Sequence, residues 1–219
     1  MDRPPESRAV RDTYDRIADH FAETRAYPWP EVTEFLDEVP DSASRGLDVG
    51  CGNGRHAEAM ANHVASVVGL DASGELLRTA RERAQSAGFL DRLALVHGDA
   101  AALPFRDRSF GVAVYVATLH HLTSRPTRRR SLDELARVLR SGGRALVSAW
   151  STEHDRFDAD EGFDTEVDWT LPGGETVPRF YHIYDPAEFR ADLDASDLSV
   201  VRSFTSSGNC YAVVRPGPD

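Results

Sequence analysis

Three acidic residues and a glycine-rich turn mark the part of the sequence that could hold a nucleotide-like ligand. The segment Leu47 to Gly54 is a short apolar run that passes through Asp48 and then carries glycines at three alternate positions. Glycine permits positive φ angles and lets a ligand lie against the backbone, where a Cβ atom would collide. A helix that starts near Gly54 would point its free N–H groups at that ligand. Asp71 ends a second apolar run and Asp99 follows a third.

The spacing of the glycines distinguishes a dinucleotide site from a site for another nucleotide-like ligand. Dinucleotide-binding turns usually read G-x-G-x-x-G, with the helix placed for a pyrophosphate, whereas Gly50, Gly52 and Gly54 read G-x-G-x-G. No obvious hydride-transfer constellation accompanies the turn, which disfavours a nicotinamide enzyme. An α/β domain whose glycine-rich turn binds no ligand is the other alternative.

The acidic residues and glycines together resemble the motifs of class I methyltransferases, which use S-adenosylmethionine. The resemblance implies that the turn lies under the methionine and ribose, that Asp71 accepts hydrogen bonds from both ribose hydroxyls, and that Asp99 accepts one from the adenine amino group. On this basis the cofactor-binding residues are expected to be Tyr14, Arg25, Asp48, Gly50, Cys51, Gly52, Gly54, Asp71, Ala72, Asp99, Ala100 and Ala117.

The elements that must position these residues alternate in the βαβ manner, which predicts a parallel sheet with right-handed crossovers. We expect strands at 46–49, 64–70, 93–96, 110–116, 144–150, 198–204 and 209–214, and helices at 10–25, 31–39, 54–62, 74–87, 128–139 and 186–195. Ser141-Gly142-Gly143 is expected to close the helix before it. The resemblance implies a Rossmann-like α/β fold with helices on both faces of a seven-stranded, mostly parallel sheet, in the order 3-2-1-4-5-7-6.

Length and composition predict a globular protein. The 219 residues suit one methyltransferase domain over 1–219, with an N-terminal helical cap at 8–40 and a substrate-side insertion at 151–185. No membrane span or secretory signal is evident, and the two cysteines have no metal-ligand spacing, so we expect a cytoplasmic enzyme without a metal.

The charge balance is strongly acidic. The net charge is −11, and all 25 basic residues are arginine. We interpret this as adaptation to high internal salt, with a GC-rich genome as a further contributor to the missing lysine. At molar salt the screening length falls to about 3 Å, so the acidic charge does not exclude an RNA substrate.

Two other segments could carry chemistry. The pair His120-His121 follows the fourth strand, and adjacent histidines cannot easily face one metal ion, so a single histidine facing the substrate is the better interpretation. The run Arg125 to Arg130 is either a solvated helix start or a phosphate-contacting patch. In the insertion, Arg179 and His182 stand among aromatic residues, where burial without partners is costly, so both are site candidates.

A narrower resemblance covers about residues 14–214. It rests on Tyr14-Asp15-Arg16-Ile17-Ala18, Thr24-Arg25 with Pro28-Trp29-Pro30, His120-His121, Arg179-Phe180-Tyr181-His182 and Gly208-Asn209-Cys210-Tyr211. These segments are similar to the tRNA wobble-uridine carboxymethyl methyltransferases. The insertion here is short and acidic, and the basic tRNA-binding surface of that family is only thinly present.

This resemblance implies a tRNA substrate, a methylated carboxymethyl group and a small zinc-binding activator subunit. A carboxylate acceptor is already ionised at neutral pH, so no general base is needed. Arg25 and Arg179 are expected to hold carboxylates of cofactor or substrate, and His121 and His182 to orient the uridine. The activator is expected at the edge strand Leu93–Val96, which carries no charge or proline to protect it; a loop or helix that covers this edge is the alternative. A small-molecule methyltransferase (quinone, lipid or small acid) and a non-catalytic cofactor-binding module are the alternatives.

Overall fold

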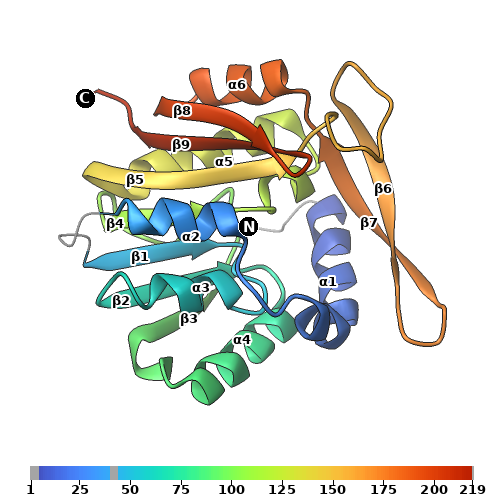
Figure 1. Cartoon of the computed structure of the whole chain (residues 1–219), viewed down its shortest axis with the longest axis horizontal. Helices are drawn as coiled ribbons and strands as arrows, with labels where there is room; N and C mark the ends of the chain where they lie inside the picture. Colours follow the sequence, from blue (N-terminus) through green and yellow to red (C-terminus); the bar gives the residue numbers. More distant parts are fainter. Residues whose placement is uncertain (1–4, 40–43, 219) are drawn as a thin grey trace.

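A seven-stranded sheet runs through the centre of the protein in the order β3-β2-β1-β4-β5-β9-β8 (Figure 1). The computed structural model describes residues 5–39 and 44–218. Strand β9 runs antiparallel to both of its neighbours, β5 and β8, and the other neighbouring strands are parallel to one another. The strands of the sheet are β1 (Arg45–Val49), β2 (Ser66–Asp71), β3 (Leu93–His97), β4 (Phe110–Tyr115), β5 (Leu139–Trp150), β8 (Leu198–Ser206) and β9 (Asn209–Pro216). The predicted fold and sheet order are confirmed, since β8 and β9 are the sixth and seventh strands of this sheet in chain order.

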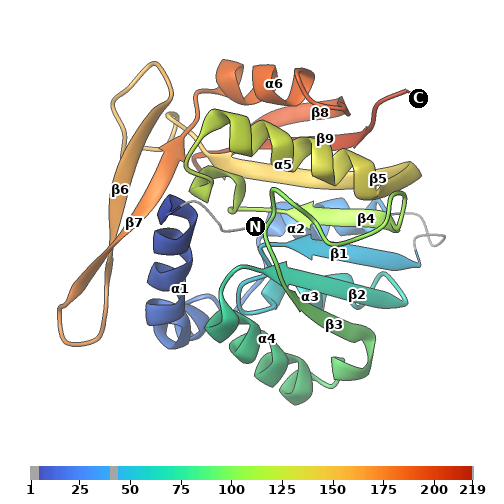
Figure 2. The ribbon, with the colours of Figure 1, turned by 180° about the vertical axis from the view of Figure 1, so that it is seen from behind.

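Helices cover both faces of the sheet, as Figures 1 and 2 show from opposite sides. On one face lie α2 (Pro30–Asp37), α3 (Arg55–Met60) and α4 (Gly74–Ala87), which bury Phe35, Met60 and Ala84. On the other lie α5 (Arg125–Val138) and α6 (Pro186–Asp194), which bury Leu132 and Phe189. Alternate residues of β4 enter the two cores, as the side-chain period of a strand requires.

The boundary between α5 and β5 differs from the predicted one. The helix begins at Arg125, after the Ser124 side chain accepts a hydrogen bond from the Thr127 N–H, and it ends at Val138. Pairing with β4 resumes at once, with Phe110 opposite Leu139. Gly142 takes a φ of +80° within β5, where the register with β4 shifts. The glycines expected to end the helix therefore serve a bulged strand.

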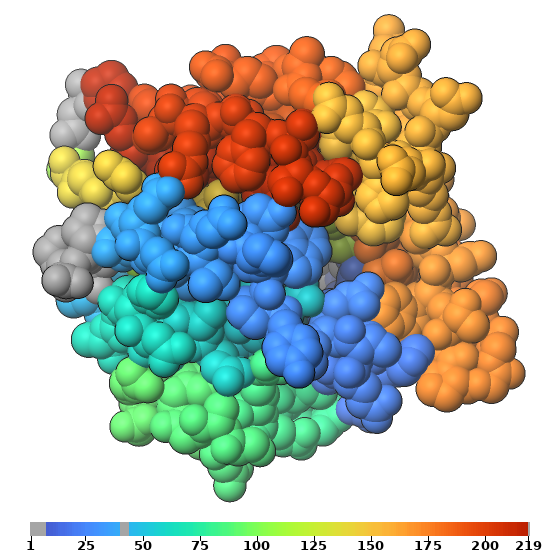
Figure 3. All heavy atoms as spheres, in the orientation of Figure 1, coloured from blue at the N-terminus to red at the C-terminus, as the bar shows by residue number. Residues whose placement is uncertain are grey.

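Helix α1 (Pro5–Thr24) and a hairpin of β6 (Phe163–Thr170) and β7 (Thr176–Ile183) stand together at the carboxyl ends of the parallel strands (Figures 1 and 2). Ile17 of α1 is buried against Trp169 and Val177 of the hairpin. In Figure 3 the hairpin projects beside α1 at the margin of the molecule. The insertion at 151–185 thus contains a two-stranded hairpin, which the sequence analysis missed. Of the predicted cap at 8–40, α1 lies at this end and α2 on a sheet face, and residue 40 is outside the described residues.

Strand β3 forms one edge of the sheet, and within the described residues it pairs only with β2. Ala94 and His97 are exposed along it. No helix within residues 5–39 and 44–218 is long and apolar enough to cross a membrane.

Candidate active site

The glycine-rich turn between β1 and α3 is shaped by contacts on both of its sides. Gly50, Gly52 and Gly54 have φ angles of +70°, +52° and +78°. A Cβ at Gly50 would lie 2.1 Å from Thr118 Oγ1, and one at Gly54 would lie 3.2 Å from the Cβ of Ala80 in α4. Gly54 therefore permits close helix packing, whereas a Cβ at Gly52 would meet only Phe21, at 3.5 Å.

Asp71, at the end of β2, is fixed by the turn and by α4. Its Oδ2 accepts a hydrogen bond from the Gly52 N–H at 2.8 Å, and its Oδ1 accepts one from the Ser73 N–H at 2.9 Å. Burial raises the pKa of Asp71, and these backbone donors oppose the rise. These two hydrogen bonds hold the carboxylate of Asp71 in place at the carboxyl ends of β1 and β2.

Asp48 lies behind the turn. It is 1% exposed, and burial, with the nearby charge of Asp71, raises its pKa to about 7. Oδ2 of Asp48 has no hydrogen-bond partner. Asp48 is buried beside Asp71 and Arg55, whose charges act on it.

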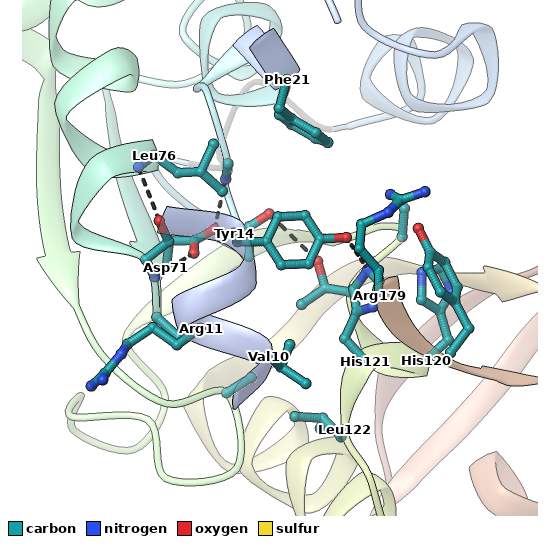
Figure 4. A pocket seen from close by; sticks show the side chains of 18 of the residues that line it. Val10, Arg11, Tyr14, Phe21, Asp71, Leu76, His120, His121, Leu122 and Arg179 are labelled. Carbon is teal, nitrogen blue, oxygen red and sulfur yellow. Dashed lines mark hydrogen bonds between the residues drawn. The ribbon is translucent and has the colours of Figure 1, made fainter. Parts of the chain in front are cut away.

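A cavity of about 460 Å³ opens between the turn, α1 and the hairpin. The predicted residues that line it are Tyr14, Arg25, Gly50, Gly52, Asp71, Ala72, Asp99, Ala100, Ala117, His121 and Arg179. Figure 4 shows Asp71 and Leu76 on one side of this cavity and the side chains of Arg179, His120 and His121 on the other, with Tyr14 between them. The predicted residues Asp48, Cys51, Gly54 and His182 are not among the lining residues. Cys51 is buried, and a Cβ added at Gly69 of β2 would lie 2.9 Å from its Sγ.

Tyr14 and His121 connect α1 to the hairpin. The Tyr14 hydroxyl lies 2.8 Å from His121 Nε2, and His121 Nδ1 lies 2.9 Å from the carbonyl oxygen of Phe180. A carbonyl only accepts, so Nδ1 carries the proton and Nε2 accepts from Tyr14. Burial lowers the pKa of His121 to about 3, which keeps the ring neutral.

Two arginines lie near one tryptophan of the hairpin. The guanidinium carbons of Arg25 and Arg179 are 5.2 Å and 4.8 Å from the ring centroid of Trp169. Arg179 is 7% exposed, and its Nε has no hydrogen-bond partner. In the described parts of the chain no carboxylate forms an ion pair with either guanidinium. Since a buried cation without an anion is costly, this side of the cavity suits an anionic ligand.

Arg55 adds a third cation at the start of α3. It is 7% exposed, lines the cavity and lies 5.4 Å from the Trp29 ring centroid. Burial and the charge of Arg25 lower its pKa to about 10. Asn53 ties the end of α1 to this region, because its side-chain amide donates to the carbonyls of Ala22 and Arg25 at 3.3 Å and 2.9 Å.

His182, which was predicted to orient the substrate, is not among the residues that line this cavity. Its Nδ1 lies 2.7 Å from Asp164 Oδ1 and its Nε2 lies 3.0 Å from Glu188 Oε2, so the ring joins the hairpin to α6. Successive side chains of a strand point to opposite faces. Arg179 and Tyr181 of β7 therefore line the cavity, and His182 does not.

Neither interpretation of the Arg125 to Arg130 run describes it fully. Arg125 and Arg129 each donate an Nε–H to Asp192 Oδ1 at 2.8 Å, and Asp192 is 0% exposed. Arg128 is itself buried, with its guanidinium carbon 5.4 Å from the Tyr184 ring centroid. These three arginines fix α5 to α6 and leave little of the run for a phosphate.

Several residues of the cavity are not among the site residues predicted from the sequence. His120 accepts a hydrogen bond from the Trp150 N–H at Nδ1 and stacks on Tyr181 with 4.8 Å between ring centroids. If residues 176–183 had been predicted to be a strand, Tyr181 would have been placed on the same face as Arg179, because the two are two residues apart. The remaining unassigned residues include Phe21, Trp29, Arg55, Thr118, Trp150, Arg156 and Trp169.

Comparisons with known proteins agree on a methyltransferase. The family described as "Methyltransferase domain" matches residues 47–147. A tRNA (carboxymethyluridine(34)-5-O)-methyltransferase of Saccharomyces cerevisiae is 34% identical over 178 residues, which are 80% of this chain and 61% of that protein. A protein of Encephalitozoon cuniculi named as a candidate methyltransferase is 34% identical over 222 residues, with 98% of this chain and 99% of that protein covered.

These matches decide the family. The chain belongs to the class I methyltransferase family that contains the tRNA (carboxymethyluridine(34)-5-O)-methyltransferases. The predicted S-adenosylmethionine-dependent enzyme is thereby confirmed. The chain spans 61% of the yeast protein and 34% of a relative of the same name from Arabidopsis thaliana. A solved structure described as a DhpI-SAM-HEP complex has a TM-score of 0.76 and 17% identity, with 99% of this chain and 100% of that chain covered, which supports the fold.

The cavity of this methyltransferase fits S-adenosylmethionine. The cofactor combines ribose hydroxyls and an adenine amino group, which are donors, with a carboxylate. Asp71 and Asp99 present acceptors at the ends of β2 and β3, and Arg25 and Arg55 present cations beside the glycine turn. Gly52 lines the cavity between the acidic residues and the arginines, and because it has no side chain its backbone is accessible to a ligand there.

Proposed function

We propose that this methyltransferase esterifies the carboxymethyl group of a wobble uridine in tRNA. The observation that carries the proposal is Arg179, a buried guanidinium that has no carboxylate partner among residues 5–39 and 44–218, in the same cavity as the residues that suit the cofactor. The names of the relatives from Saccharomyces cerevisiae and Arabidopsis thaliana supply the substrate.

The cofactor half of the site is assigned to the turn and α1. Asp71 would accept from the ribose hydroxyls and Asp99 from the adenine amino group. Arg25 and Arg55 would hold the methionine carboxylate, because both lie beside the glycine turn. Tyr14 would close this half from α1, since its hydroxyl is fixed by His121.

The acceptor half is assigned to the hairpin. S-Adenosylmethionine, when bound, would supply a methyl group on a sulfonium, whose sulfur would leave as a neutral thioether. Arg179 would bind the acceptor carboxylate by paired hydrogen bonds and orient one oxygen for attack. A carboxylate needs no base, so orientation and exclusion of water supply most of the acceleration, about 7–11 kcal/mol for well-oriented pairs.

Nucleoside mass spectrometry tests this function. Bulk tRNA from a strain that lacks the gene is compared with tRNA from the parent and from strains complemented with the wild type or Arg179→Gln. We expect the deletion and Arg179→Gln strains to lose a wobble-uridine methyl ester and accumulate its free acid. Arg144→Gln is the matched control, because Arg144 is exposed, is not among the residues that line the cavity, and stands six residues before Trp150 in β5. An unchanged nucleoside profile would reject tRNA as the substrate and direct the search to small acids.

We further propose that a small zinc-binding activator subunit pairs with the exposed edge of β3. The free edge of a sheet offers unpaired N–H and C=O groups to a partner strand. Leu95→Arg should prevent co-purification of such a subunit, whereas Val201→Arg on β8, the opposite edge of the sheet, should not. Retained assembly in a folded Leu95→Arg protein would reject this interface.

A further inference from the structure

One arginine at the mouth of the cavity has no part in the chemistry assigned above. Arg156 lines the cavity, is exposed, and has no ion pair or side-chain hydrogen bond within the described parts of the chain. It is the one basic residue, histidine apart, between Arg144 and Arg179, a stretch that contains nine acidic residues. An isolated cation in such a stretch cannot form a general basic surface, but it can make a single contact with an anion.

The backbone that carries Arg156 is firmly anchored. The Arg156 N–H donates to His154 Nδ1 at 3.1 Å, and the Phe157 N–H donates to the His154 carbonyl at 2.9 Å. The rings of His154 and Phe157 lie 5.3 Å and 5.8 Å from the Trp150 ring centroid. Arg156 is therefore presented from a packed aromatic turn at the end of β5.

The position of Arg156 relates it to the acceptor half of the site. Trp150 and Tyr181, with 4.8 Å between their ring centroids, form one wall of the cavity. The positive charge of Arg156 acts on the hydroxyl of Tyr181, where it opposes the rise in pKa that burial causes. Arg179 lines the same half of the cavity. Arg179 is buried, whereas Arg156 is exposed at the rim.

We propose that Arg156 binds a backbone phosphate of the nucleotide whose carboxymethyl group lies at Arg179. The inference rests on the proposed function, because a nucleotide in RNA carries both anions, whereas a small acid carries only the inner one. Arg156 is thus a specificity residue that favours an acceptor within a polynucleotide. Phosphate contacts of this kind position the substrate and do not read its base.

Steady-state kinetics of Arg156→Gln on tRNA that carries the free acid tests this inference. Removing one phosphate contact should raise KM for tRNA about tenfold at moderate salt, with kcat unchanged at saturating tRNA. The slope of log(kcat/KM) against log[KCl] should become less negative by about one. Arg156→Lys should restore the slope, and Arg144→Gln should leave both quantities at the wild-type value.

Two results would overturn the inference: a salt slope that stays at the wild-type value, or a fall in kcat at saturating tRNA without a rise in KM. The second would place Arg156 at the reacting group. Failure of the proposed function is distinguishable, because the wild-type protein itself would then transfer no methyl group to this tRNA.

Discussion

His121 should act as a neutral hydrogen-bond bridge, and its replacement tests that role quantitatively. The ring accepts from the Tyr14 hydroxyl at 2.8 Å and donates to the Phe180 carbonyl at 2.9 Å. His121→Ala removes both bonds, each with a typical net contribution of about 1 kcal/mol. If α1 and β7 must both be held in the reactive arrangement, about 2 kcal/mol corresponds to a roughly 30-fold loss of kcat/KM.

His121→Gln separates this role from acid–base catalysis. The amide of glutamine offers one acceptor and one donor, so it should recover most of the activity that His121→Ala loses. Because burial lowers the pKa of His121 to about 3, its ring stays neutral from pH 6 to 9, and kcat/KM should show no inflection from it. His63→Gln, at a half-exposed histidine outside the cavity, is the control.

The assay is transfer of a labelled methyl group from S-adenosylmethionine to tRNA that carries the free acid, measured across that pH range. An inflection near pH 6.5 in the wild-type profile that disappears in His121→Gln would refute the bridge and indicate a titrating base. Equal inactivity of His121→Gln and His121→Ala, with both proteins folded, would also count against it.

Two further predictions concern stability, measured by thermal unfolding. Burial raises the pKa of Asp48 from 3.8 to about 7, so its ionised form destabilises the folded protein above pH 7, and protonation relieves this cost as the pH falls toward 4. Asp48→Asn should therefore stabilise the protein at pH 8, by an amount on the order of a few kcal/mol, and have little effect at pH 4; equal shifts at both values would contradict this. Asp192→Ala should destabilise by about 1–3 kcal/mol, because the buried Tyr184 hydroxyl loses its acceptor, whereas Arg125 and Arg129 are 44% and 40% exposed and can be hydrated; an unchanged midpoint would contradict it.

Local pattern predicted most of the fold, because each βα unit has its own apolar run and its own turn. The helix at Gly74–Ala87 has the predicted bounds: Ser73 caps its start and Gly88, with a φ of +76°, ends it. The boundary at Ser141 to Gly143 failed because the same glycine signal suits a helix end and a strand bulge, and only pairing with β4 distinguishes them.

The site could be predicted where a residue's place depends on its own strand end, as for Asp71. Residues whose place depends on pairing over long sequence distances could not. Trp169 pairs with Val177 across the hairpin and meets Arg25 from α1, a contact between residues that are far apart in the chain. His182 was predicted for the site, whereas Tyr181 lines the cavity. The reason is that residues 176–183 were not predicted to be a strand, and in a strand alternate side chains share a face.

The electrostatics of the cavity restrict the acceptor more than its shape does. Burial lowers the pKa of His120 and His121 well below 6.5, so both rings are weak bases, and burial raises the pKa of Tyr14 and Tyr181, which keeps both hydroxyls protonated. An alcohol or amine acceptor needs a group that removes its proton, and on this wall of the cavity these four residues do not provide one. Under the proposed function, a carboxylate would arrive ionised and meet the buried guanidinium of Arg179. The same features that make these histidines poor bases, burial and a nearby arginine, therefore favour an acceptor that needs none.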